Sequence, residues 1–163
     1  LYRGREYPPR PNVKPLSEVL KDKPAWKDVF ELRSRPGMRG FLDPIHVGDP
    51  EEVRERAAMM ASVDEGVGML LHELEKNNTL DNTCIVFLGD NGFFFGEHGL
   101  GAERRFAYEE GIRTAFFVRY PKLVKAGTQV KQMVLAIDIA PTMIELAGGK
   151  PGPQIQGLSL IHI

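Results

Sequence analysis

The sequence predicts an α/β fold, in which a partial parallel or mixed sheet carries helices on its faces. Three observations support this class. Apolar residues recur at helical spacing between 50 and 76, and compact apolar runs at 83–89 and 113–120 are typical of buried strands. A third run, at 132–137, leads into a helical pattern at 139–147. Strands that alternate with helices favour a parallel sheet.

The helix predicted over 50–76 has clear start and stop signals. Asp49 suits the N-cap, Pro50 suits the first helical position, and two glutamates follow at the positive end of the helix dipole. Asn77-Asn78 ends the pattern. We expect its apolar stripe to be part of the core; the stripe consists of Met60, Val63, Val67, Leu70, Leu71 and Leu74.

The strand predicted at 83–89 ends in residues that can carry chemistry. Asp90 and Asn91 follow it directly, and ligands of α/β proteins bind beyond the carboxyl ends of strands. Both side chains supply the oxygen ligands that a hard divalent cation takes. The alternative is structural, with Asn91-Gly92 forming a turn that Asp90 caps. Cys84, inside the strand, is interpreted as a core thiol.

The rest of the chain gives weaker signals. We expect residues 1–48 to form an irregular, proline-rich segment packed on the domain, anchored by Trp26 and Phe30 with one short helix near 25–33. Asp138 precedes the helix at 139–147, where an N-cap is favoured over a metal role. One codon series for 158–163 resembles the end of a sequencing adaptor, so we expect a non-native tail after Gly157.

Composition narrows the classes of partner. The 163 residues are 42% apolar with a formal net charge of −1, which gives no electrostatic bias toward nucleic acid or anionic membranes. We therefore expect no nucleic-acid partner. No apolar run approaches the roughly 20 residues that a membrane-spanning helix needs. One cysteine excludes an intrachain disulfide, and the sequence gives no oligomeric state.

Several motifs appear in a fixed order from about residue 50 to 157. Leu80-Asp81-Asn82-Thr83 precedes the strand, and Asp90-Asn91-Gly92 follows it. The others are Gly96-Glu97-His98-Gly99-Leu100, Arg104 to Arg113, Phe117 to Pro121, Asp138 to Thr142 and Leu146-Ala147-Gly148. Together they resemble the carboxyl-terminal part of a sulfatase catalytic domain, in the alkaline-phosphatase superfamily. The resemblance implies that 49–157 are an incomplete catalytic domain of this fold.

The resemblance also implies roles for four residues. Asp90 and Asn91 would be half of a Ca²⁺ or Mg²⁺ site. His98 would face the cleft, although a loop histidine bonded to backbone is an equal alternative. Arg104 stands where the family usually places a lysine that contacts sulfate; arginine keeps the charge but cannot donate a proton. Its alternative is a solvated surface residue. The substrate would be a sulfated small molecule or polysaccharide, in a periplasmic or extracellular enzyme.

The sequence has no match to the nucleophile motif of the family. Sulfatases use a cysteine or serine, oxidised to formylglycine, in a Cys/Ser-x-Pro/Ala-x-Arg motif. In the nearest match, Ser34 to Arg39, the arginine falls one place late. We therefore expect this chain alone to be inactive, while its complete parent would hydrolyse sulfate esters. The alternatives are a phosphoester or phosphonate hydrolase of the same superfamily, or a non-catalytic metal-binding or structural remnant.

Overall fold

The computed structural model describes residues 12–14, 16–21, 50–99 and 104–162. These residues fall into two compact units. The first is drawn from Leu1–Leu80 and Val86–Phe117, and the second from Asp81–Ile85 and Val118–Ile163. Most of the proline-rich segment, including Trp26, Phe30 and the helix expected near 25–33, lies outside the described residues.

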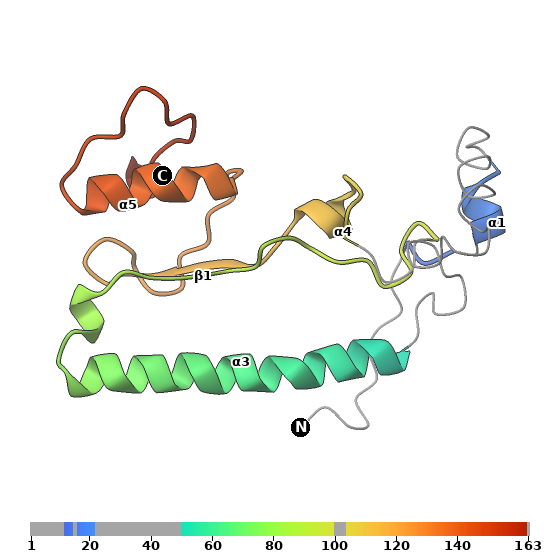
Figure 1. The fold of residues 1–163 in the computed structure, drawn as a ribbon, viewed down its shortest axis with the longest axis horizontal. Helices are drawn as coiled ribbons and strands as arrows, with labels where there is room; N and C mark the ends of the chain where they lie inside the picture. Colours follow the sequence, from blue (N-terminus) through green and yellow to red (C-terminus); the bar gives the residue numbers. More distant parts are fainter. Residues whose placement is uncertain (1–11, 15, 22–49, 100–103, 163) are drawn as a thin grey trace. The chain divides into compact units, whose positions relative to one another are not determined.

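The first unit is dominated by the long helix α3 (Pro50–Lys76), which confirms the predicted span (Figure 1). Its last turn is closed by Asn77, whose side-chain Nδ2 donates to the carbonyl of Glu73 at 2.8 Å. Asn78 then takes a positive φ of 56°, a conformation that asparagine tolerates better than most residues. The expectation that the apolar stripe of α3 is part of the core is wrong for the described structure, because no residue of α3 is buried there.

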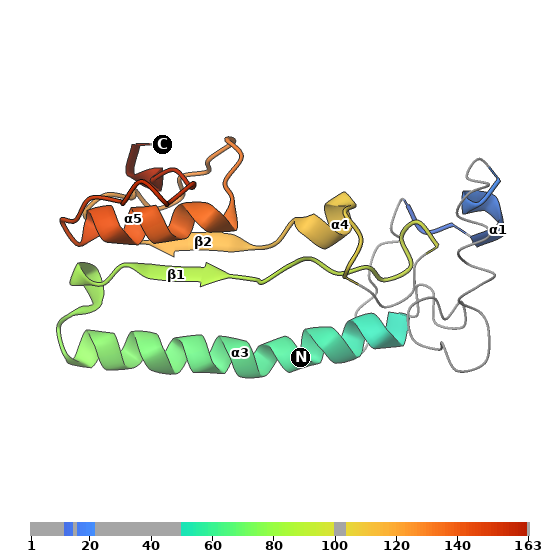
Figure 2. The ribbon, with the colours of Figure 1, turned by 45° about the horizontal axis from the view of Figure 1, so that its top comes forward.

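The strands β1 (Ile85–Leu88) and β2 (Phe116–Arg119) pair in a two-stranded sheet. The amide of Gly89 donates to the carbonyl of Ala115 at 3.1 Å, and the Phe87 and Phe117 rings lie 6.1 Å apart. The two strands are therefore antiparallel, and Figure 2 shows their arrows running in opposite directions. The parallel arrangement expected for these two strands is wrong, whereas the α/β class is confirmed.

Two short helices complete the first unit. They are α1 (Leu16–Val19) and α4 (Glu109–Ile112), neither of which the sequence pattern predicted. The segment before α1 reaches the loop that follows β1, because Val13 and Glu97 form an isolated antiparallel bridge. From the other side, the Arg56 guanidinium of α3 lies over the Phe93 ring, 4.0 Å from its centroid. The loop after β1 is thus held from both α3 and the amino-terminal segment.

In the second unit, the helix predicted at 139–147 is confirmed as α5 (Ile139–Leu146). The strand predicted at 132–137 is wrong, since the described chain has a bend at 132 and then irregular residues that lead into the 3₁₀ turn η3 (Ala136–Asp138). Another 3₁₀ turn, η2 (Leu80–Asn82), precedes β1. The ion pair between Arg119 and Asp81, at 2.6 Å, links β2 to η2.

Asp138 stands at the N-cap position of α5, but its carboxylate makes no capping bond to that helix. One oxygen instead accepts from the amide of Leu135 at 2.9 Å, and the other from the amide of Leu158 at 2.8 Å. These two bonds hold the pKa of Asp138 below its ordinary value, against a smaller opposing effect of burial. The predicted N-cap position is therefore confirmed, but the expected capping bond is absent, and Asp138 instead joins the turn before α5 to the segment leading into η4 (Leu160–His162).

Candidate active site

Asp90 and Asn91 stand beyond the carboxyl end of β1, as the sequence predicted. The Asp90 carboxylate is exposed, and its Oδ1 accepts from the Asn91 amide at 2.9 Å. Asn91 is half-buried, and its Nδ2 donates to the carbonyl of Gly92 at 2.6 Å. These local bonds are those of a turn, yet they leave the second Asp90 oxygen and the Asn91 amide oxygen without a hydrogen bond among the described residues. The turn and a cation-binding role are therefore compatible.

The position of this pair is fixed by two glycines that touch. The amide of Gly92 donates to the carbonyl of Gly111 at 2.8 Å. A Cβ on Gly92 would lie 2.0 Å from the carbonyl oxygen of Glu110, and one on Gly111 would lie 2.5 Å from that of Phe106. Neither position has room for a side chain. This close approach holds Gly92, the residue after Asn91, against the backbone of α4.

The segment of sequence between these two glycines contributes an aromatic cluster, made of Phe94, His98, Phe106 and Tyr108. Phe94 is fully buried and meets the other three rings edge to face, at centroid distances between 6.1 and 6.4 Å. The His98 ring stacks on Tyr108 with centroids 4.1 Å apart and planes 14° from parallel. Such offset and edge contacts are the arrangements that aromatic quadrupoles favour. The cluster is the packed centre of the first unit.

His98 is held by polar contacts as well as by stacking. Its Nε2 lies 2.9 Å from the Glu110 Oε2, and its backbone amide donates to the Asn12 carbonyl at 2.9 Å. The residue takes a φ of 58°, in the left-handed region that costs a residue with a side chain some strain. His98 is thus held through its backbone by Asn12 and through its ring by Glu110, and its role in facing a substrate cleft stays a prediction.

Glu110 and Asn12 are the residues that sequence reasoning missed. The Glu110 Oε1 accepts from the Asn12 Nδ2 at 3.0 Å. Although burial acts to raise it, hydrogen bonds from Asn12, from its own backbone amide and from His98 hold the pKa of Glu110 below its ordinary value. Glu110 is therefore an ionised carboxylate at neutral pH. It lay inside a recognised motif, whereas Asn12 had no signal beyond its place among prolines.

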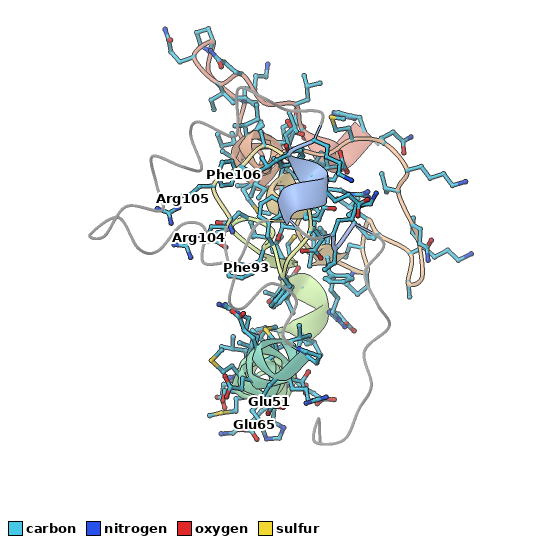
Figure 3. The ribbon with its side chains drawn as sticks, turned by 90° about the vertical axis from the view of Figure 1, so that its right-hand side faces the viewer. Glu51, Glu65, Phe93, Arg104, Arg105 and Phe106 are labelled. Atoms are coloured by element: carbon cyan, nitrogen blue, oxygen red, sulfur yellow. The ribbon has the colours of Figure 1, made fainter. Side chains whose placement is uncertain are left out.

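Arg104 is exposed, and so is its neighbour Arg105. Figure 3 shows both side chains extending away from the ribbon on the same side of the first unit. The described contacts join Asp90 to Asn91, and His98 to Glu110. They do not place Arg104 against either pair, so its contact with sulfate stays a prediction. Residues 34–39, the nearest match to a nucleophile motif, lie outside the described part of the chain.

The donor set at Asp90 and Asn91 fits part of a metal site. A carboxylate and an amide oxygen are hard ligands of the type that Ca²⁺ and Mg²⁺ take, but these ions need six or more. Within residues 12–14, 16–21, 50–99 and 104–162, no group of three or more histidine, cysteine, aspartate or glutamate side chains could hold a metal. A cation bound here would therefore need ligands from elsewhere.

Comparison with known proteins decides the family. The sequence model of the sulfatase family matches residues 6–149, which include the whole candidate site. The chain belongs to the sulfatase family. The resemblance inferred from the motifs is thereby confirmed.

Individual relatives agree with this assignment. The chain is 45% identical over 150 residues to an N-acetylglucosamine-6-O-sulfatase of Bacteroides thetaiotaomicron, a match that covers 90% of the chain and 26% of the relative. It is 37% identical over 111 residues to an N-acetylglucosamine-6-sulfatase of Capra hircus, with 68% and 20% covered. It is also 33% identical over 125 residues to a putative extracellular sulfatase Sulf-1 homolog of Caenorhabditis elegans, with 76% and 18% covered.

A solved structure supports the fold. It is that of a protein in complex with its substrate D-glucosamine-2-N,6-O-disulfate, and it matches 67% of this chain and 22% of its own with a TM-score of 0.64 and 45% identity. The alkaline-phosphatase-like α/β class is thus confirmed for this sulfatase chain. The chain spans only 18–26% of the length of these three relatives. Among the described residues, no helix is both long enough and apolar enough to cross a membrane.

Proposed function

We propose that this chain is part of a longer sulfatase that hydrolyses a sulfate ester of a glucosamine-type sugar, free or within a polysaccharide. The observation that carries the proposal is the 45% identity, over 90% of the chain, to an enzyme named for the 6-O-sulfate of N-acetylglucosamine. The solved relative holds a glucosamine disulfate as its substrate. The exposed Asp90 and half-buried Asn91 beyond β1 support the proposal, because they offer oxygen ligands of the kind that a divalent cation takes.

Asp90 and Asn91 would act as ligands of a Ca²⁺ or Mg²⁺ ion. When bound, that ion supplies positive charge that polarises the sulfate group. The two side chains differ in what they give, because Asp90 brings a negative charge and Asn91 a neutral oxygen. The Gly92 to Gly111 contact at 2.8 Å supports both by fixing the backbone that follows them. The remaining ligands would come from other parts of the enzyme.

Arg104 and His98 would contact the substrate. The exposed Arg104 guanidinium can grip two sulfate oxygens at once, and its charge does not depend on pH. His98 has one ring nitrogen held by Glu110, which leaves Nδ1 for the substrate. The nucleophile would be a formylglycine supplied outside the residues that the structure describes. Because relatives from Caenorhabditis elegans and Drosophila melanogaster are named as extracellular sulfatases, the first as a putative one, we also propose a periplasmic or extracellular location.

The test uses the full-length enzyme and three substrates: glucosamine 6-sulfate, an aryl sulfate and the matching aryl phosphate. We expect turnover of the sugar sulfate to exceed that of the aryl sulfate, and little turnover of the phosphate. Asp90→Ala should abolish most activity, whereas Asn91→Asp should keep the metal, as measured by calcium titration. Phosphate turnover above sulfate turnover would instead assign the enzyme to the phosphoester hydrolases of the superfamily.

Arg104 has a sharper test of its own. Arg104→Lys should retain or raise kcat/KM, because lysine restores the side chain that the family usually has there. Arg104→Ala should raise KM and lower kcat, and Arg105→Ala is the matched control from the same exposed pair. Unchanged kinetics in Arg104→Ala would reject the sulfate contact. The isolated 163-residue chain should release no sulfate above background, because binding groups without a nucleophile leave most of the barrier in place.

A further inference from the structure

Three residues form a closed ring of hydrogen bonds around His98. The His98 backbone amide donates to the Asn12 carbonyl at 2.9 Å. The Asn12 side chain donates to one oxygen of Glu110 at 3.0 Å, and the other oxygen of Glu110 lies 2.9 Å from the His98 Nε2. The ring begins and ends on the same histidine, so it restrains both the backbone and the imidazole of that residue.

The chemistry of the ring fixes where the histidine proton lies. Glu110 is an ionised acceptor, because its hydrogen bonds lower its pKa. A carboxylate can approach an imidazole nitrogen at 2.9 Å only if that nitrogen donates, so Nε2 must be protonated. In neutral His98 the lone pair is then on Nδ1. Which nitrogen a histidine offers to a ligand is set by the hydrogen bond that its other nitrogen makes.

Packing against neighbouring rings also restrains the plane of the His98 imidazole. Tyr108 stacks on one face of the imidazole at 4.1 Å, and the fully buried Phe94 meets it edge to face. Only 24% of the His98 side chain and 20% of the Glu110 side chain is exposed, so both partners are largely shielded from water. The hydrogen bond between them is stronger in such surroundings than in water.

We propose that Asn12 and Glu110 are positioning residues that fix the orientation and the tautomer of His98, leaving Nδ1 as the ring nitrogen available to the substrate. The inference deepens the proposed function and rests on its assignment of His98 to the substrate site. It also gives the proline-rich segment a role in the site. Asn12 holds the loop of His98 through its carbonyl and holds Glu110 through its amide.

The first test is Glu110→Ala in the full-length enzyme, with Glu109→Ala as the matched control. Glu109 is the adjacent glutamate, but its side chain is 70% exposed and, among the described residues, forms an ion pair with Arg113 alone. We expect Glu110→Ala to lower kcat by up to about a hundredfold, since small misplacements of a reacting group have effects of this size. KM should change by less than about twofold, because Glu110 does not touch the substrate. Asn12→Ala should have the same pattern with a smaller loss.

A double-mutant cycle separates positioning from general loss of structure. If Glu110 acts through His98, then Glu110→Ala should cost little further activity in a His98→Ala background. Glu110→Gln should recover part of the loss, since its amide oxygen can still accept from Nε2. Additive losses in the cycle, or a kcat loss in Glu110→Ala matched by an equal loss of folded enzyme, would overturn the proposal.

The tautomer is measured directly by nitrogen NMR on histidine-labelled enzyme. We expect the Nε2-protonated form of neutral His98 in the wild type and a mixture in Glu110→Ala. An Nδ1-protonated His98 in the wild type would overturn the proposal even if every variant lost activity. This measurement needs no turnover. An enzyme that hydrolyses no sulfate ester would reject the proposed function, whereas the NMR result still decides whether Glu110 fixes His98.

Discussion

Helix α3 and the aromatic cluster belong to the same unit of the chain, yet they bury their side chains to opposite extents. In α3, Met69 is 73% exposed and Leu70 is 68% exposed, and no residue of the helix is buried. In the cluster, Phe94 has no exposed surface at all. A regular helix and a packed core therefore form for different physical reasons. The hydrogen bonds of a helix are local, whereas burial needs partners from distant segments.

The cluster finds its partners within the described chain. Phe94 is surrounded by residues that come 4 to 17 positions later, and the Gly92 to Gly111 contact closes the loop around it. The apolar stripe of α3 has no such cover among the described residues. Because the chain spans 26% of a relative with which it shares 45% identity, we expect other segments of the proposed longer enzyme to cover this stripe.

The largest effect should come from the centre of the cluster. Phe94→Ala in the full-length enzyme should lower the free energy of unfolding by about 3–5 kcal/mol, because it removes a fully buried ring and leaves a cavity. Chemical denaturation monitored by fluorescence measures it. His72→Ala, at an exposed position of α3, is the control, with an expected change within about 0.5 kcal/mol. Equal costs at both positions would contradict the contrast between the two regions.

The next effect tests whether α3 is covered in the longer enzyme. Leu70→Ala should cost about 2–4 kcal/mol in the full-length enzyme if its stripe packs against other segments. In the isolated 163-residue chain, the exposed stripe should instead bind a hydrophobic dye and promote aggregation. Leu70→Gln should reduce that dye binding. A sharp, cooperative thermal transition of the isolated chain as a monomer would contradict the expectation that the exposed stripe of α3 promotes aggregation.

Local signals in the sequence were enough for α3, α5 and the position of β1. Proline at the first helical position, two asparagines at the end and an apolar period of 3.6 residues fix α3 without reference to the rest of the fold. The prediction of a strand at 132–137 was wrong because the local signal was not sufficient there. Its apolar residues suit a strand, but Asp138 draws the chain into a 3₁₀ turn by accepting from Leu135, and a strand also needs a neighbour to pair with.

The candidate site was predictable only in part. Asp90 and Asn91 stood out because their side chains carry recognisable chemistry at a strand end, and His98 because it lies in a motif that resembles the family's. Asn12 could not be found, since its importance depends on a contact with Glu110 that spans 98 positions of the sequence. The direction of β2 relative to β1 was equally hidden. Both depend on tertiary contacts that no local pattern encodes.

A smaller effect comes from adding one methyl group in each region. Gly92→Ala should cost about 1–3 kcal/mol, because the new Cβ would lie 2.0 Å from the carbonyl oxygen of Glu110 and the backbone must move. Gly68→Ala in α3 meets nothing within 4 Å and should stabilise the helix by about 0.5–1 kcal/mol. Thermal denaturation of both variants gives the comparison. Destabilisation by Gly68→Ala would show that other segments of the longer enzyme approach that glycine.

The smallest effect should be the acid dependence that Glu110 gives to the cluster. Hydrogen bonds from Asn12 and His98 oppose burial and hold its pKa below the ordinary value of 4.5, so the folded state binds fewer protons than the unfolded state between the two pKa values. The stability from Glu110 is therefore complete above pH 4.5 and is lost as the pH falls through the lower folded pKa. Thermal denaturation of wild type and Glu110→Gln over this range measures it.

Glu110→Gln should remove part of the acid sensitivity, with Glu109→Gln again as the control. Some sensitivity should persist, because hydrogen bonds from Leu135 and Leu158 lower the pKa of Asp138 in the other unit, and protonation of that carboxylate weakens these bonds. Protonation of Glu110 weakens the cluster, and protonation of Asp138 weakens the turn before α5. Identical acid profiles for wild type and Glu110→Gln would mean that the bond to His98 contributes nothing to folding.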